Sequence, residues 1–203
     1  MMRAALLLAL GLGAMSIAPV ARAAPNASPL PGDSLYQLRA ELTSADAGHR
    51  ALAELRGTPT LVTMFYTSCP GICPLLAFAM RRIDDALTPG QRANLRLVMI
   101  SIDPERDTPA ALTEFSRLNQ LEGARWLVAS TPEPAVRELA AALGIRFRKL
   151  PDGGFSHSTV ITLLDADGVA RARTSKMTGL DADFMTTLTA LTAGGTTNAK
   201  EAP

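Results

Sequence analysis

The chain has 203 residues, with 20 lysines and arginines against 19 aspartates and glutamates, so its formal net charge is +1. The two signs are interspersed and no basic run occurs, so nothing indicates a nucleic-acid partner. Hydrophobic residues make up 47% of the chain, and a chain of this length is able to bury a sizeable core.

The N-terminus has the pattern of an export signal. Arg3 supplies a positive charge, an apolar stretch covers 4–18, and Ala21-Arg22-Ala23 has the small-x-small pattern of a cleavage site. The alternative, an uncleaved membrane anchor, fits less well because a spanning helix needs about 20 apolar residues. We therefore expect residues 1–23 to be a cleaved signal peptide, the protein to be exported to the periplasm, and the mature chain to lack a stable membrane span.

The rest of the chain predicts one domain between two flexible ends. Residues 24–33 are rich in proline and small residues, which is typical of a flexible lead, and 193–203 are small and polar, as in a disordered tail. We expect a single domain over 34–192. Its first part, 34–55, carries patterns too mixed to assign.

Strands and helices are expected to alternate from residue 61 onward. Near-continuous apolar runs, typical of parallel strands buried on both faces, occur at 61–66, 95–102 and 126–129. Helices are expected to follow each run, with Thr108 and Thr131 as caps and Gly144 as a stop, at 75–87, 109–121 and 132–143.

The end of the domain predicts an antiparallel hairpin and a helix. Apolar segments at 158–164 and 169–174 flank the turn signal Asp165-Ala-Asp-Gly168, and a helical segment follows at 181–191. Together these elements predict an α/β, thioredoxin-like fold, with a central mixed sheet flanked by helices and a C-terminal β-hairpin and helix.

Cys69 and Cys73 are the only cysteines in the chain. Their i, i+4 spacing at the start of a predicted helix places both sulfurs on one face, where they can close a disulfide or hold one soft metal ion. A structural disulfide is the plain interpretation in an exported protein, but so short a ring stabilises a fold little. Backbone N–H groups and the helix dipole are expected to lower a thiol pKa there.

His157 is one of two histidines and lies in the segment 153–158, which we interpret as a mobile loop leading into the strand 158–164. A lone histidine is usually structural. Two thiolates and an imidazole nevertheless suit copper, as three-coordinate Cu(I) or as Cu(II) with a further weak ligand. Zinc would also bind to two thiolates and an imidazole, although a structural zinc site requires a fourth protein ligand. The charged segment 102–109 predicts only capping and surface ion pairs.

Three motifs, in this order, resemble those of the Sco (SenC-like) family: Cys-x-x-x-Cys-Pro within 65–74, Asp-Pro-x-Arg-Asp-Thr-Pro within 101–109, and His157 before the last hairpin. That family consists of thioredoxin-fold copper chaperones for cytochrome c oxidase assembly. The resemblance implies that Cys69, Cys73 and His157 are copper ligands and that the cysteines also form a redox-active disulfide. It further implies a copper donor protein, and cytochrome c oxidase subunit II, with its binuclear copper centre, as the recipient.

The chain departs from the family pattern at two places beside these ligands. Gly71 and Ile72 stand between the cysteines, where the family commonly has an acidic residue, and Ser156 stands where it commonly has an aspartate. Both changes remove negative charge, which bears on Cu(II) affinity, on the reduction potential and on docking to a partner.

The alternative function is a thiol–disulfide oxidoreductase that reduces the cysteines of the oxidase copper site or of other exported proteins. Cys69 would attack the disulfide and Cys73 would resolve the intermediate. A general thioredoxin-type enzyme is disfavoured, because it uses Cys-x-x-Cys and carries a proline directly before the strand at 158. A peroxide-reducing relative fits less well, because it requires threonine or serine in place of Tyr66 and proline in place of Val62.

Overall fold

The computed structural model describes residues 28–69 and 71–193. The expected signal peptide at 1–23 and all but the first residue of the expected tail lie outside these ranges. Among the described residues, no helix has the length and apolar character needed to cross a membrane.

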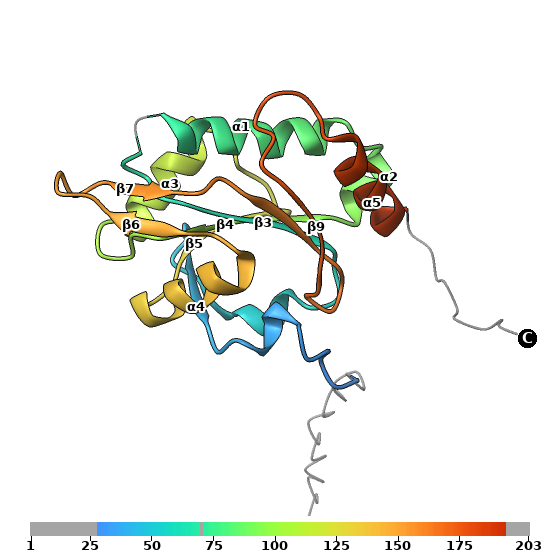
Figure 1. Cartoon of the computed structure of the whole chain (residues 1–203), viewed down its shortest axis with the longest axis horizontal. Helices are drawn as coiled ribbons and strands as arrows, with labels where there is room; N and C mark the ends of the chain where they lie inside the picture. Colours follow the sequence, from blue (N-terminus) through green and yellow to red (C-terminus); the bar gives the residue numbers. More distant parts are fainter. Residues whose placement is uncertain (1–27, 70, 194–203) are drawn as a thin grey trace, which may run out of the picture.

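The strands form a central seven-stranded sheet and a separate two-stranded sheet (Figure 1). Their bounds are β1 (Glu41–Ser44), β2 (His49–Ala51), β3 (Thr60–Phe65), β4 (Arg96–Ser101), β5 (Trp126–Ser130), β6 (Phe147–Lys149), β7 (Phe155–His157), β8 (Ile161–Leu164) and β9 (Ala170–Thr174). The order in the large sheet is β2-β1-β5-β4-β3-β8-β9. β4 is parallel to both β3 and β5, and the other pairs are antiparallel.

Helices cover both faces of the large sheet. They are α1 (Ile72–Asp85), α2 (Pro89–Ala93), α3 (Pro109–Leu118), α4 (Glu133–Leu143) and α5 (Ala182–Thr192), with short 3-10 turns η1 (Leu35–Gln37) and η2 (Leu52–Leu55). In Figure 1, α1 lies along one side of the sheet and α4 along the other, while α5 lies beside α2 at one end. The predicted α/β architecture with a mixed, helix-flanked sheet is therefore confirmed.

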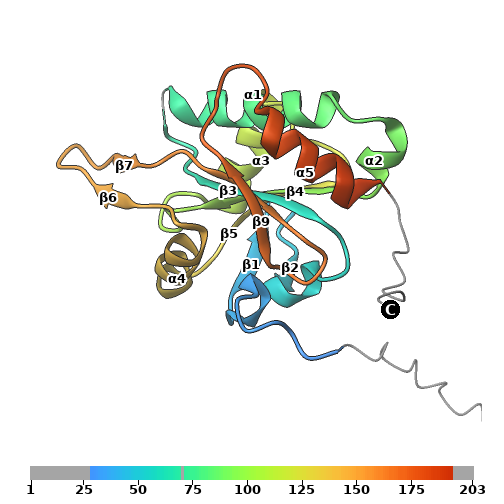
Figure 2. The same cartoon turned by 45° about the vertical axis from the view of Figure 1, so that its right-hand side comes forward.

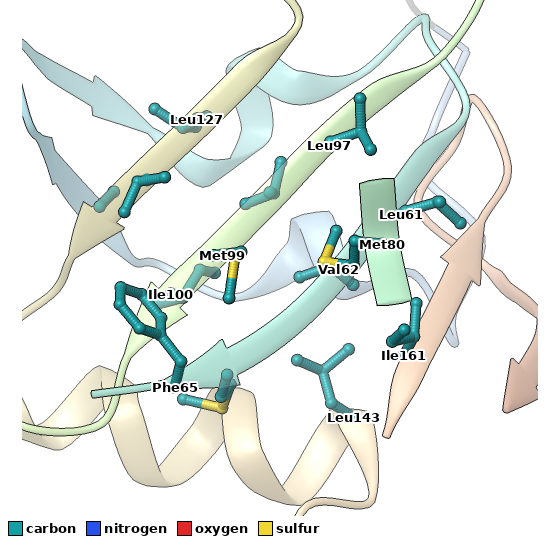
Figure 3. Close-up of a cluster of buried hydrophobic side chains, with 14 of the residues drawn as sticks. Leu61, Val62, Phe65, Met80, Leu97, Met99, Ile100, Leu127, Leu143 and Ile161 are labelled. Carbon is teal, nitrogen blue, oxygen red and sulfur yellow. The ribbon is translucent and has the colours of Figure 1, made fainter. Parts of the chain in front are cut away.

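The core is centred on β3 and β4, because both strands have helices on both faces. Every residue of β3 is buried, which explains why its sequence is nearly continuous in apolar residues, apart from Thr60 and Thr63, rather than alternating. Met64, Met80 and Met99 are fully buried, as expected for packing residues, and Figure 3 shows Met80 and Met99 among aliphatic side chains of several strands.

The three parallel strands and the β8–β9 hairpin are confirmed, while several boundaries differ. α1 begins at Ile72 rather than at 75, so it includes Cys73. Thr108 caps α3 as expected, but the expected Thr131 cap is wrong: its hydroxyl donates to the carbonyl of Glu41, and α4 begins at Glu133. The segment 34–55 contains the β1–β2 hairpin, whose first strand pairs with β5.

The segment 153–158 is not the mobile loop that we expected. Phe155–His157 is strand β7, which pairs antiparallel with β6 and places His157 opposite Phe147. The strand expected to begin at 158 begins only at Ile161. His157 is thus held by a two-stranded hairpin that projects from the body of the molecule, as Figure 2 shows.

Gly168, in the turn between β8 and β9, is expected to tolerate no side chain. Its φ is +83°, and an added Cβ would lie 2.5 Å from Cδ2 of Tyr36. Gly123 has φ +100° but open space around it. Gly123→Ala should therefore cost about 1 kcal/mol for backbone strain alone, and Gly168→Ala about 3 kcal/mol because overpacking adds to that strain. Urea unfolding measures both; equal losses would contradict the close packing of Gly168 on Tyr36.

Candidate metal centre

The two cysteines lie where the chain passes from the end of β3 into α1. Cys69 is in the turn, Gly71 is the residue before the helix, and Cys73 is in the first helical turn. Both thiols are free and buried, Cys69 with 7% of its surface exposed and Cys73 with none. The predicted placement of the pair at a strand-to-helix turn is confirmed.

Backbone N–H groups point at both sulfurs. The N–H of Cys73 approaches the Sγ of Cys69 at 3.4 Å, and the N–H of Tyr66 approaches the Sγ of Cys73 at 3.5 Å. Such donors stabilise a thiolate more than a thiol, because the hydrogen bond to the charged form is stronger. The local fold of the turn therefore brings partial positive charge to each sulfur.

The two thiols nevertheless differ in acidity. Burial would raise the pKa of Cys69, but the N–H groups of Gly71 and Cys73 outweigh it and the pKa is lowered. Burial raises the pKa of Cys73 well above its usual range, and the donor from Tyr66 does not compensate. The expectation of a lowered pKa at the helix start is thus correct for Cys69 and wrong for Cys73, because complete burial outweighs the helix terminus.

His157 reaches the cysteines from a distant part of the sequence. Its Nε2 lies 3.7 Å from the Sγ of Cys73, although 84 positions separate the two residues. Its Nδ1 is 3.2 Å from the carbonyl oxygen of Ser158, and only a protonated Nδ1 donates to that oxygen. Burial lowers the pKa of His157, so the ring is neutral near pH 7 and Nε2 has its lone pair toward the sulfur.

Cys69, Cys73 and His157 thus meet in one place, but not as a finished metal site. Within 28–69 and 71–193, no group of three or more His, Cys, Asp and Glu side chains stands ready to hold a metal ion. Two soft thiols and one imidazole with a free Nε2 fit copper by donor chemistry. A small shift of the turn or of the hairpin would be needed for all three to contact one ion.

Tyr66, the first residue after β3, ties the hairpin to the cysteine turn. Its hydroxyl donates to the carbonyl of Phe155 at 3.2 Å and accepts the N–H of the same residue at 3.3 Å. Its ring packs edge-on against Phe155 and His157, with centroid separations of 5.4 and 5.9 Å. Tyr66 therefore sets the position of β7, and with it the position of the imidazole.

Asp107 holds the turn from the opposite side and was missed by the sequence interpretation, which assigned the segment 102–109 only capping and surface pairing. Its carboxylate is fully buried and accepts the hydroxyl of Thr67 at 2.6 Å, the N–H of Thr67 at 3.1 Å, and the hydroxyl of Ser101 at 2.5 Å. Burial raises its pKa despite these donors. The run of charged residues at 102–109 gave no sign that two of them, Asp103 and Asp107, are buried.

The neighbouring Arg106 connects the same loop to the hairpin. Its guanidinium pairs with Asp103, donates to the carbonyl of Gly153 and lies 5.9 Å from the ring centroid of Phe155. The loop after β4 therefore contacts both halves of the site, the cysteine turn through Asp107 and the histidine hairpin through Arg106.

We expect the two thiols of the reduced, metal-free protein to react at different rates with iodoacetamide. The thiolate is the nucleophile, so the lowered pKa of Cys69 gives it the larger reactive fraction at pH 7, and each pKa unit changes that fraction about tenfold. Cys69 should be alkylated more than about tenfold faster, by mass spectrometry of peptides, and the difference should vanish in urea. Faster alkylation of Cys73 in the folded protein would contradict the assignment.

Asp107→Asn should weaken the turn that carries Cys69. The amide removes one of the two acceptor oxygens that Thr67 and Ser101 use, which leaves a buried donor unsatisfied at a cost of about 1–3 kcal/mol. Glu105→Gln, an exposed change on the same loop, is the control. Urea unfolding and the Cys69 alkylation rate in the folded protein should both change only in Asp107→Asn; equal behaviour of the two variants would contradict the role of Asp107.

The chain is similar to known proteins both in sequence and in structure. A protein of Stutzerimonas stutzeri that is named for copper binding is 31% identical over 121 residues, which are 58% of each chain. The chain thus spans under two thirds of that relative. Copper-bound ScoI of Bradyrhizobium japonicum is similar in structure, with a TM-score of 0.63, 24% identity and coverage of 75% of this chain and 96% of that one.

A second solved structure is BsSco, described as a Sco family member of the cytochrome c oxidase assembly proteins with a disulfide switch. It has a TM-score of 0.64 and 21% identity, and covers 75% of this chain and 90% of that one. These structural likenesses confirm the thioredoxin-like fold. The family model SCO1/SenC matches residues 32–191, so the chain belongs to the SCO1/SenC family.

Proposed function

We propose that this protein binds one copper ion through Cys69, Cys73 and His157 and delivers it to the binuclear copper centre of cytochrome c oxidase subunit II. The observation that carries the proposal is the 3.7 Å approach of the His157 Nε2 to the Sγ of Cys73, with the free lone pair on that nitrogen. Copper bound to the Bradyrhizobium relative and the name of the Stutzerimonas relative support it.

The protonation states of the two thiols are compatible with a copper ion replacing the thiol protons. Cys73 keeps its proton until metal arrives, because its pKa is raised, whereas Cys69 loses its proton more easily. Copper binding would release both thiol protons to solvent, since the thiolate is the ligand, and His157 would bind without losing a proton. The set suits Cu(I) with three ligands, or Cu(II) with a further weak ligand.

The compartment follows from the N-terminal pattern. An export signal at 1–23 would place the mature protein in the periplasm, where a copper donor protein loads it. The oxidase subunit as recipient follows from membership of the family, whose member BsSco is described as an oxidase assembly protein.

Disulfide exchange is the second candidate, and the lowered pKa of Cys69 favours it. The Cys69 thiolate would attack a disulfide of the partner and release one partner thiol. The Cys73 thiolate would then attack the mixed disulfide, so that the partner leaves reduced and a Cys69–Cys73 disulfide remains. The second step needs a deprotonated Cys73, as copper binding does, but exchange makes no use of the imidazole 3.7 Å from Cys73, so we place copper delivery first.

Copper titration of the reduced protein tests the proposal. We expect one copper per chain and, for Cu(II), a thiolate charge-transfer band in the visible spectrum. His157→Ala should shift or weaken that band and lower copper affinity at least about 100-fold, as loss of a ligand should cost no less than loss of a group that supports one. His49→Ala is the matched control, because His49 is exposed on β2 and its side chain hydrogen-bonds only to the Thr43 hydroxyl among the described residues.

The same variants separate the two candidate functions. Thiol exchange with a disulfide peptide should survive His157→Ala, since that reaction needs only the two sulfurs. Absence of stoichiometric copper uptake by the wild-type protein, together with rapid exchange, would replace copper delivery by thiol reduction. Equal copper affinity of His157→Ala and His49→Ala would remove the histidine from the ligand set.

A further inference from the structure

The β6–β7 hairpin has two unlike faces, because successive side chains of a strand point in opposite directions. The inner face carries Phe147, Lys149, Phe155 and His157; Phe155 and His157 pack against Tyr66, and the two phenylalanine rings are 6.2 Å apart. The outer face alternates with it in register: Arg148 lies opposite Ser156, and the N–H of Arg146 donates to the hydroxyl of Ser158.

The cations of the outer face have no carboxylate partner within the described ranges. Arg146 and Arg148 are exposed, and neither takes part in any ion pair there. Lys149, opposite Phe155 and so on the inner face, pairs with Glu105 at 3.4 Å, with both side chains more than half exposed. Asp152 is the only carboxylate between residues 144 and 158. The hairpin that carries His157 therefore has an excess of positive charge.

These groups surround a shallow hollow that includes the histidine. Its volume is about 340 Å³, and its lining consists of Arg146, Phe147, Arg148, Ser156, His157 and Ser158. Guanidinium groups are donors only, and the hydroxyl of Ser156 has no hydrogen bond among the described residues. The lining of the hollow thus offers several donors and contains no carboxylate, which suits a carboxylate of a partner.

We propose that the outer face of the β6–β7 hairpin, through Arg146 and Arg148, docks an acidic protein surface that exchanges copper with this site. The inference rests on the proposed copper function and names the chemistry of its partner. A protein surface fits better than a small anion, because the donors are spread over a projecting, solvent-exposed arm rather than gathered in a closed cavity (Figure 2). Ile72, exposed between the two cysteines, adds an apolar contact beside the sulfurs.

The test measures copper transfer to two synthetic acceptor peptides that contain the same pair of cysteines, one flanked by glutamates and the other by lysines. At low salt, the copper-loaded wild-type protein should transfer to the glutamate peptide about tenfold faster, because opposite charges raise association rates. The advantage should be lost in the double variant Arg146→Ser, Arg148→Ser, and should fall with added salt.

The matched control is the double variant Arg39→Ser, Arg173→Ser, which removes two exposed arginines that also lack ion pairs in the described part of the chain. It should keep the preference for the glutamate peptide. Equal transfer to both peptides by the wild-type protein, or equal behaviour of the two double variants, would overturn the proposal.

A second measurement is independent of copper. Hexaglutamate added to the reduced, copper-free protein should shift the NMR amide signals of Phe147 and Ser156, which line the hollow, in the wild type and not in the Arg146→Ser, Arg148→Ser variant. If the wild type bound no copper but showed these shifts, the proposed function would fail and the acidic docking face would stand. Shifts with inorganic phosphate and none with hexaglutamate would make the hollow a small-anion site and overturn the docking proposal.

Discussion

The site depends on one buried carboxylate. β3 and β4 are parallel neighbours, so the segments that follow them leave the sheet side by side, and Asp107 joins them by accepting from Thr67 and Ser101. A buried carboxylate is stable only if hydrogen-bond donors surround it, and the segments after β3 and at the end of β4 supply these donors to Asp107. The turn that carries the cysteines is thereby held to the loop after β4 before any metal or partner is present.

The position of His157 also depends on the loop after β4, indirectly through the β6–β7 hairpin. A two-stranded hairpin is marginally stable by itself, and β6–β7 shares no strand pairing with the large sheet. Its inner face is held instead by Tyr66, which hydrogen-bonds both backbone groups of Phe155, and by Arg106. A hairpin fastened by side chains rather than by a continuous sheet can shift slightly, which would suit the proposed uptake and release of copper.

The environment makes the two cysteines chemically unequal. Backbone donors dominate at Cys69 and burial dominates at Cys73, so one thiol is ready to react and the other keeps its proton. Metal binding and the resolving step of disulfide exchange both require Cys73 to lose that proton, because the thiolate is both the ligand and the nucleophile. The order in which we place the two proposed functions therefore depends on His157, and the proposed docking face of the hairpin would add a preference for partners of the opposite charge.

Much of this protein was predictable from its sequence. The near-continuous apolar runs predict strands buried on both faces, Thr108 marks a real helix cap, and the spacing of Cys69 and Cys73 places them at a helix start, because these features depend on local geometry and hydrophobicity. The short strands β6 and β7 have no such signal, since each has only three residues and is stabilised by contacts with a distant tyrosine.

The burial of individual side chains and the contacts between distant segments became known only from the tertiary structure. Asp107 lies among charged residues in a segment that is typical of a surface loop, and the sequence does not indicate that it is enclosed. Complete burial likewise reverses the acidity expected for Cys73. The sequence determined which groups are available for chemistry, because donor type is a property of the residue. The packing of distant segments determined their protonation and their contacts, because desolvation depends on neighbours that local sequence does not specify.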